Sequence, residues 1–206
     1  MQEFKRLPAT KFSVSRRRLT WGVGVNDADY LTNPSVSGKT KACPVYVAWS
    51  GMLQRGYSEK YKALHPSYIG VTVCDEWLIF SNFSRWYANN YVNGYDLDKD
   101  IKLKGSKLYS PNTCLYVPQE INKLFTDHKA ARGALPLGVS AKGNRYRARV
   151  NREGVSVALG SFSTPQAAHE AYKVGKNESI MMASAKYPEF GEYLKQHIYE
   201  GEPLIK

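Results

Sequence analysis

Cysteine is scarce in this sequence, and the chain contains no closely spaced cysteine pair. Its 206 residues include only Cys43, Cys74 and Cys114. An odd number of widely spaced cysteines argues against a disulfide framework and favours a reducing compartment. Structural zinc usually binds close cysteine pairs. The three thiols and His65 could reach a zinc ion only by converging through the fold, so we expect buried free thiols instead.

Long apolar runs and internal repeats are also lacking. No stretch is long and apolar enough for a membrane span, and we find no basic amphipathic helix with a clean apolar face. The basic start, MQEFKRLPATKFSVSRRR, has no apolar segment of signal-peptide length. These absences predict a cytoplasmic protein with no membrane partner. The hydrophobic share of 43% is near the globular average, which argues against wholesale disorder.

Acidic residues are too few to balance the basic ones. Lysine and arginine number 29 against 18 aspartates and glutamates, a net charge of +11. Such an excess favours a polyanionic partner, because neutralising phosphates releases counterions.

The acid deficit is sharpest at the N-terminus. Before position 20 the only acid is Glu3, and glycines and Asn33-Pro34 interrupt residues 20–42, so residues 1–42 are interpreted as an arm without long regular elements. Two readings of its basic residues remain open. Arg16, Arg17 and Arg18 either lie along a phosphate backbone or belong to a solvated terminus.

Residues 44–90 show helical and strand patterns typical of a packed core. Tyr46, Trp49, Met52 and Leu53 recur at helical spacing and predict a helix over 44–57. A short strand is expected at 71–74. Aromatic residues spaced from Trp77 to Tyr87 predict a helix face that packs inward, although aromatic rings also stack on bases.

Residues 97–122 read as strand, loop, strand and helix. The alternation in 97–101 (LDKDI) predicts a strand with Asp98 and Asp100 on one face. A Lys-Gly-Ser turn and the loop YSPNTC lead to an apolar strand at 115–117. Pro118 suits the first turn of a helix that carries Asn122.

This arrangement resembles the HNH endonuclease motif, a β-β-α finger that holds one divalent metal. The segments 43–55 and 71–83 also resemble those that precede the finger in the phage subgroup, so the resemblance covers about 43–125. It implies that Asp98 and Asn122 are the metal ligands. Thr113 falls where the family has its central Asn, and Lys99 falls where an active enzyme has its His general base.

The residues at these four catalytic positions suit a metal better than they suit a base. Asp98 and Asn122 are hard oxygen ligands appropriate to Mg²⁺ or Mn²⁺. Lys99, with an ordinary pKa near ~10.4, holds its proton at neutral pH and is better suited to gripping a phosphate. Thr113 cannot orient a base as Asn does. Catalysis would then need another base, such as a metal-bound hydroxide or His65.

A second domain begins after about residue 134. Turns at 142–144 and 151–154 separate three short strands, and Thr164-Pro165 predicts the start of a helix from Gln166 to about Ala185. Strict alternation in 145–150 (RYRARV) places three arginines on one strand face. No acid occurs between 135 and 152, so these positions favour DNA contact over a solvated sheet face: Lys142, Arg145, Arg147, Arg149 and Arg152.

The same segment, over about 135–177, resembles the Apetala/ethylene-response-factor DNA-binding domain, which also occurs fused to phage HNH proteins. The matching residues include Gly138-Val139, 146–149 (YRAR), 159–162 (LGSF) and 167–172 (AAHEAY). The resemblance implies that the helix-free face of the sheet lies in the DNA major groove.

Together these patterns predict an α+β chain: a basic arm (1–42), a degenerate HNH ββα-metal finger domain (43–127), a linker (128–134), and a three-stranded antiparallel sheet with one packed helix and a short C-terminal helix (135–206). We expect a double-stranded DNA partner and, by resemblance, a phage-infected bacterial cell. The predicted function is that of a metal-dependent DNA endonuclease, of the nicking or homing kind. The alternative is a catalytically inactive protein that acts by occupying DNA.

Overall fold

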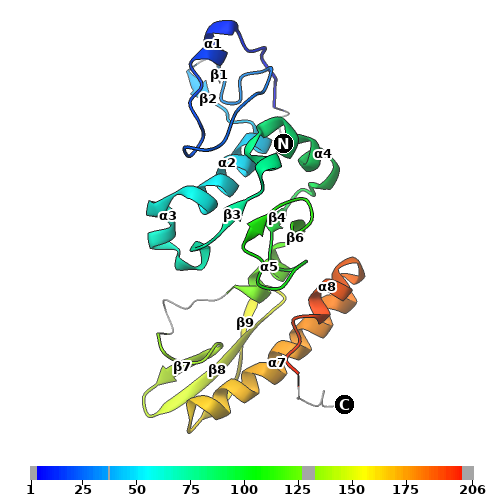
Figure 1. The fold of residues 1–206 in the computed structure, drawn as a ribbon. Coiled ribbons are helices and arrows are strands. Elements are labelled where there is room, and N and C mark those ends of the chain that lie inside the picture. Colours follow the sequence, from blue (N-terminus) through cyan, green and yellow to red (C-terminus); the bar gives the residue numbers. More distant parts are fainter. Residues whose placement is uncertain (1–3, 37, 127–132, 201–206) are drawn as a thin grey trace. The chain divides into compact units, whose positions relative to one another are not determined.

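The computed structural model describes residues 4–36, 38–126 and 133–200, and the fold is a mixture of helices and small sheets of the α+β kind. The chain forms two compact units (Figure 1). Unit 1 comprises residues 1–91 and 105–115, and unit 2 comprises 92–104 and 116–206. The chain therefore leaves unit 1 after Tyr91, returns to it for eleven residues, and completes unit 2. This division cuts across the predicted domains, because both strands of the finger sheet lie largely in unit 2.

Unit 1 is mainly helical. Its elements are α1 (Lys11–Ser15), β1 (Ser35–Val36), β2 (Lys39–Thr40), α2 (Pro44–Tyr57), α3 (Glu59–Leu64), η1 (Pro66–Tyr68), β3 (Thr72–Val73), η2 (Asp75–Leu78), α4 (Phe80–Asn90) and β5 (Leu108–Tyr109). Strands β1 and β2 pair antiparallel, and β3 pairs in parallel with β5. In its described residues, 4–36 and 38–42, the arm contains only the five-residue helix α1 and the two-residue strands, as its glycine-rich sequence predicts.

An aromatic core holds unit 1 together. The helix predicted over 44–57 is α2, and its stripe of Trp49, Met52 and Leu53 is fully buried. Trp77 and Phe80 are buried against it, and the Trp49 indole Nε1 donates a hydrogen bond to the Trp77 carbonyl at 2.7 Å. The aromatic residues therefore serve packing. The second helix starts later than the pattern suggested, at Phe80, after the short 3₁₀ turn η2.

The first part of unit 2 is a two-stranded sheet followed by a helix. Strand β4 (Tyr95–Asp98) pairs with β6 (Leu115–Pro118), and α5 (Gln119–Phe125) follows β6 directly. The strand expected over 97–101 ends at Asp98 instead. The Asp98 carboxylate accepts hydrogen bonds from the backbone N–H groups of Asp100 and Ile101, both at 2.7 Å, and this local turn competes with a continued strand.

The second part of unit 2 is the predicted three-stranded sheet with one helix. It comprises β7 (Val139–Lys142), β8 (Arg145–Arg152), β9 (Val155–Phe162) and α7 (Pro165–Lys186), followed by η3 (Pro188–Phe190) and α8 (Gly191–Lys195). The strands form an antiparallel meander in the order β7-β8-β9. Thr164 caps α7 through a hydrogen bond from the Ala167 N–H, as predicted. The C-terminal helix is shorter than the expected 192–199.

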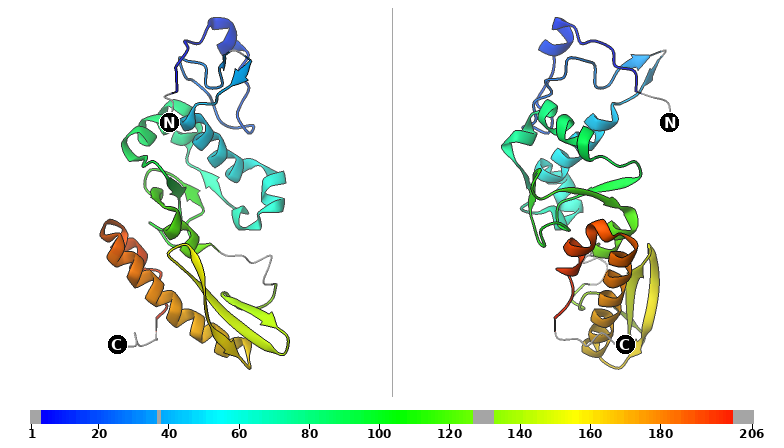
Figure 2. Two further views of the ribbon diagram at one scale, coloured as in Figure 1. Left: turned by 180° about the vertical axis from the view of Figure 1, so that it is seen from behind. Right: turned by 90° about the vertical axis from the view of Figure 1, so that its right-hand side faces the viewer.

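Helix α7 packs on one face of this sheet, as the right-hand view of Figure 2 shows. The core between them contains Val139, Ala148, Val150, Ala168 and Tyr172. Gly138 adopts a positive φ of 77°, and a Cβ there would come within 1.9 Å of the Tyr172 ring. Only glycine fits this close approach, which brings the start of β7 onto α7. Of the predicted linker 128–134, residues 128–132 lie outside the described part of the chain.

Candidate nucleic-acid interface and candidate metal site

The central strand β8 presents arginines on the sheet face away from α7. Tyr146, Ala148 and Val150 pack toward the helix, so Arg145, Arg147 and Arg149 project from the opposite face. Arg145 and Arg149 are exposed, and Arg147 is partly buried. The predicted assignment of the two strand faces is confirmed at these six positions.

The neighbouring strands carry small or basic residues opposite the arginines. Across the register, Arg147 pairs with Ser140 on β7 and with Ser161 on β9, Arg145 pairs with Lys142, and Arg149 pairs with Ala158. Because Ser140, Ser161 and Ala158 have short side chains, they leave room for the guanidinium groups above the surface of the sheet. A bulge between Ala148 and Arg149 shifts the register on the β9 side without turning either residue to the other face.

None of these basic groups is neutralised within the described residues. No Asp or Glu of 4–36, 38–126 and 133–200 lies within ion-pair distance of Lys142, Arg145, Arg147 or Arg149. The Arg145 guanidinium donates to the Ser161 carbonyl at 2.6 Å and to its hydroxyl at 3.3 Å. This holds Arg145 over the sheet while its positive charge stays uncompensated.

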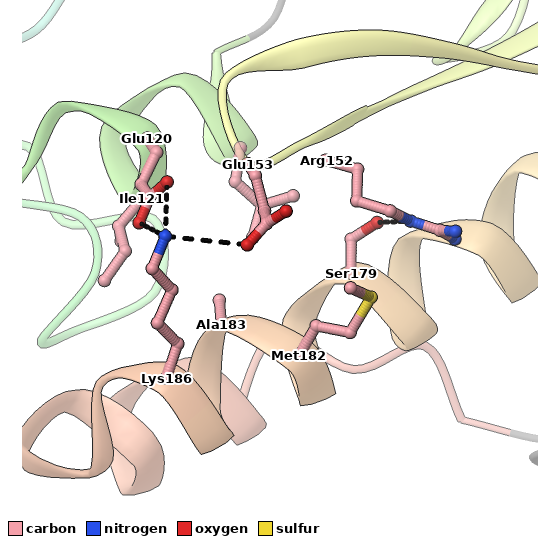
Figure 3. Close-up of a pocket in the computed structure, with 9 residues that line it drawn as sticks. Glu120, Ile121, Arg152, Glu153, Ser179, Met182, Ala183 and Lys186 are labelled. Carbon is pink, nitrogen blue, oxygen red and sulfur yellow. Dashed lines mark hydrogen bonds and ion pairs between the residues drawn. The ribbon is translucent and has the colours of Figure 1, made fainter.

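Arg152, which the sequence grouped with the other arginines, points the other way. It lies two residues after Val150 and so shares that residue's strand face, which packs on α7. There its guanidinium pairs with Glu178 at 2.7 Å and reaches the Ser179 hydroxyl at 3.4 Å. Figure 3 shows the hydrogen bond between Arg152 and Ser179 beside a small pocket. Arg152 therefore ties the sheet to its helix.

On the other side of the same pocket, Lys186 of α7 bridges two carboxylates (Figure 3). Its ammonium lies 2.8 Å from Glu120 of α5 and 3.5 Å from Glu153 in the β8–β9 turn. The hydrogen bond from Lys186 lowers the pKa of Glu120 and raises that of the lysine. The bridge links the finger helix α5 with the sheet and helix of the second half of unit 2.

The three consecutive arginines of the arm have different environments. Arg17 donates to three backbone carbonyls, those of Asn26 (2.9 Å), Ala28 (2.6 Å) and Tyr30 (2.9 Å). These hydrogen bonds hold the loop 26–30 against the Arg17 side chain. Arg16 lies 5.2 Å from the Phe12 ring centre, and both Arg16 and Arg18 are exposed. These two remain available for a phosphate backbone.

Asp98, the predicted first metal ligand, closes a turn at the end of β4. Both backbone hydrogen bonds from Asp100 and Ile101 reach its Oδ1 atom. Burial raises the pKa of Asp98, although the two backbone N–H groups oppose this by stabilising the carboxylate. A nearby cation would likewise favour the ionised form.

Lys99, at the general-base position, is buried in an ion pair. Only 5% of the residue is exposed, and its ammonium lies 2.6 Å from Asp100 Oδ1. The ion pair with Asp100 gives the Lys99 side chain a structural partner of its own. That Lys99 is a poor base stays a prediction.

Asn122, the predicted last ligand, meets Asp96. Its side-chain amide on α5 donates to Asp96 Oδ2 at 3.0 Å. Asp96 and Asp98 lie two residues apart on β4 and so share one face of the strand. The sequence reasoning missed Asp96, although its spacing from Asp98 was a usable signal.

These three residues form an oxygen-rich donor set. Two carboxylates and an amide are ligands that Mg²⁺ or Mn²⁺ accepts, with water at the remaining positions. Within the described residues no three His, Cys, Asp or Glu side chains gather around a common point. Asp96 and Asn122 meet directly, and Asp98 adds a carboxylate on the same strand face, so the ligand atoms at this place are hard oxygens and include no soft ligand.

Thr113, predicted to replace the family's central Asn, organises its own loop in unit 1. Its hydroxyl donates to the Leu108 carbonyl at 2.6 Å and accepts from the Ser110 N–H at 3.1 Å. His65, the alternative base, packs its ring on Tyr61, with centroids 4.4 Å apart. None of the three cysteines is in a disulfide: Cys43 and Cys114 are buried, and Cys74 is half-buried.

The C-terminal segment holds the loop that follows Asp98. Gln196 donates to the carbonyls of Ile101 (3.3 Å) and Lys102 (3.2 Å), and the His197 Nε2 lies 3.3 Å from the Ile101 carbonyl. Lys176 of α7 donates to the Leu124 carbonyl at the end of α5. Each of these contacts joins the finger to the second half of unit 2.

Comparison with known proteins gave no relative. A scan against family models found no match, and searches of curated proteins and of solved structures found none either. Among the described residues no helix is both long and apolar enough to cross a membrane.

Proposed function

We propose that this protein binds double-stranded DNA through the β7–β9 sheet and hydrolyses it at an HNH-like finger with one divalent metal. The observation that carries the proposal is the helix-free face of β8, where three arginines stand in a row without an acidic partner among the described residues. The resemblance of 135–177 to a DNA-binding sheet supports the same assignment.

The spacing of the arginines suits a nucleic acid. Alternate residues of a strand lie ~6.5–7 Å apart, close to the separation of successive phosphates along a DNA strand. A guanidinium also matches the O6 and N7 atoms of guanine in the major groove. The short side chains of Ser140, Ala158 and Ser161 beside the arginines allow the sheet surface to approach the bases.

The finger supplies the residues for hydrolysis. Asp96, Asp98 and Asn122 would hold the metal. A bound divalent cation stabilises the negative charge that develops on a phosphate during hydrolysis. We do not assign Lys99 as the base, because its buried Nζ is already engaged in an ion pair with Asp100.

The second candidate is a protein that occupies DNA without cutting it. The Lys99–Asp100 ion pair favours it, because this lysine stands where an active enzyme has its base. So does the turn at Asp98, which gives that carboxylate a structural role of its own.

Plasmid cleavage with Mg²⁺ or Mn²⁺ tests the nuclease. Asp98→Asn is the informative variant, since its side-chain oxygen still accepts the two backbone hydrogen bonds while the negative charge is lost. We expect the wild type to nick or linearise supercoiled DNA, and Asp98→Asn and Asp96→Asn to remain folded but inactive. A wild type that binds DNA and never cuts it supports the second candidate instead.

A gel-shift comparison of two arginines tests the DNA surface. Arg147→Ala should weaken duplex binding by about 1–3 kcal/mol and reduce its salt dependence. Arg152→Ala, on the opposite face, is the matched control and should lower thermal stability with little change in affinity. Equal effects of the two substitutions on affinity would exclude the proposed face.

A further inference from the structure

Arg55 is a partly buried cation in unit 1, in the last turn of α2. Its Nε donates to the Tyr109 hydroxyl at 2.9 Å, and its guanidinium carbon lies 5.4 Å from the Tyr109 ring centre. Tyr109 is 3% exposed. The contact therefore holds the base of the guanidinium in place and leaves its two terminal nitrogens to other partners.

No described carboxylate compensates this charge. A guanidinium has five N–H donors. The hydrogen bond to Tyr109 uses one of them, and no Asp or Glu in the described ranges lies within ion-pair distance. The negative end of α2 offsets the charge only in part, since a helix terminus carries about half an elementary charge.

Tyr109 does not supply an anion. Burial raises the pKa of Tyr109, so its hydroxyl stays neutral. Burial alone would lower the pKa of Arg55, but Tyr109, Tyr68 and Tyr61 outweigh it, and the pKa of the arginine is raised. Arg55 is thus a permanent cation in a half-buried position, an arrangement that favours an anion from outside the chain.

Tyr61 and Tyr68 are close enough to affect the pKa of Arg55, and the His65 ring packs against both of them. Tyr61 lies 4.4 Å from His65 and 5.6 Å from Tyr68, centroid to centroid, and His65 lies 6.5 Å from Tyr68. His65 is exposed, whereas Tyr61 and Tyr68 are partly buried. We call Arg55, Tyr61, His65, Tyr68 and Tyr109 the Arg55 cluster.

The surroundings of the cluster are basic. Between positions 44 and 74 the only acidic residue is Glu59, which pairs with Lys62 at 3.3 Å. Lys107 adds a further positive charge beside Tyr68, where its ammonium donates to the Ser67 carbonyl at 2.9 Å. The local charge therefore attracts anions to the same place that the arginine occupies.

We propose that the Arg55 cluster binds single-stranded DNA, with a phosphate at Arg55 and an unpaired base on the rings of His65 and Tyr68. A paired base is covered by its neighbours, whereas an unpaired base offers a face that aromatic side chains stack on. The site rests on the proposed function, since a protein that opens or cuts a duplex exposes such a strand. The phosphate is either internal to the strand or at its 5′ end.

Fluorescence anisotropy with labelled single strands tests the site in the full-length protein. Arg55→Gln should weaken binding of a short single strand by about tenfold, the loss of one charged contact to phosphate. Lys60→Gln removes an exposed charge from the same region and is the matched control, with a change below about threefold. His65→Ala, at an exposed ring, should weaken binding by about fivefold through lost stacking and does not disturb the core.

Several results would overturn the inference. Equal losses for Arg55→Gln and Lys60→Gln would show that only net charge matters. If Arg55→Gln fails to fold, His65→Ala decides, and unchanged single-strand affinity in that variant refutes the site. Strands with and without a 5′-phosphate distinguish the two sources: tighter binding of the phosphorylated strand assigns a terminal phosphate, and equal binding assigns an internal one.

The outcome is separable from that of the proposed function. Duplex binding through the sheet is measured with Arg147→Ala, and single-strand binding with Arg55→Gln. A wild type that binds duplex but no single strand refutes the Arg55 site alone. A wild type whose single-strand binding depends on Arg55 but that binds no duplex refutes the proposed function and leaves the site.

Discussion

Replacing Lys176 with Met should stabilise the protein at neutral pH. Lys176 lies on α7 with only 5% of its surface exposed. Its Nζ donates to the Leu124 carbonyl and lies 4.4 Å from the Phe125 ring centre. Burial lowers its pKa from 10.5 to about 7. The folded protein therefore holds this lysine neutral at a pH where the unfolded chain protonates it.

The size and sign of the effect follow from proton linkage. Between pH 10.5 and about 7 the unfolded state binds the extra proton, so stability falls as the pH is lowered through this window and then levels off. At about 1.4 kcal/mol for each pKa unit, the drop from 10.5 to about 7 corresponds to a cost of roughly 5 kcal/mol at neutral pH.

Methionine removes this cost and introduces a smaller one. The Leu124 carbonyl loses its donor, which costs about 1–3 kcal/mol. The net gain at pH 7 is then roughly 2–4 kcal/mol, and it shrinks by about 1.4 kcal/mol for each pH unit toward pH 9. Near pH 9 the remaining cost of keeping the lysine neutral, about 2 kcal/mol, equals that of the lost hydrogen bond, so no gain is left.

Thermal unfolding of wild type and Lys176→Met at several pH values measures this difference. Lys195→Met, a half-exposed lysine paired with Glu192, is the control and should follow the wild type at every pH. Comparing the variants at each pH cancels the titration of other groups. Parallel curves for the wild type and Lys176→Met would refute the reasoning, because they would mean that Lys176 keeps its charge in the folded state.

Three further substitutions test the fold. Gly138→Ala should destabilise unit 2 by about 3 kcal/mol or more, because its Cβ would meet the Tyr172 ring. Gly143→Ala, at φ 57° with open space around it, is the control and should cost only about 1 kcal/mol. Similar melting temperatures for the two variants would contradict this. Burial lowers the pKa of His197, so stability should fall as the pH drops below 6.5, and His197→Gln should flatten that decline in thermal melts. Arg17→Met should cost unit 1 roughly 2–4 kcal/mol by chemical denaturation, since three carbonyls lose their donor, and a loss of duplex affinity without a loss of stability would restore its role as a DNA contact.

Regular patterns in the sequence predicted the parts of the fold that depend on one element. The helical spacing of Trp49, Met52 and Leu53 gave α2 with its bounds, because burial of one helix face imposes that spacing. The alternation in 145–150 gave the two faces of β8 for the same reason. Thr164 and Pro165 marked the start of α7 through their backbone chemistry alone.

Features that depend on several elements were not predictable in this way. The turn at Asp98 arises from side-chain hydrogen bonds that a pattern of polarity does not show. Asn122 meets Asp96 because of how α5 follows the β4–β6 pair. The carbonyls around Arg17 converge only when the loop 26–30 folds. The strand face of Arg152, in contrast, was predictable, because Arg152 and Val150 are alternate residues of one strand and so lie on the same face.

The hydrogen bonds from Gln196 and His197 to the loop after β4 have a consequence for where a DNA strand would be cut. With Lys176 on Leu124, they join the finger and the arginine sheet within one compact unit. Under the proposed function, such a protein would cleave at a fixed number of base pairs from the sequence it recognises. Inserting half a helical turn of DNA between the recognised sequence and the cleavage position would place the scissile phosphate on the far side of the duplex. A protein whose two parts were joined by a flexible linker would still reach that phosphate.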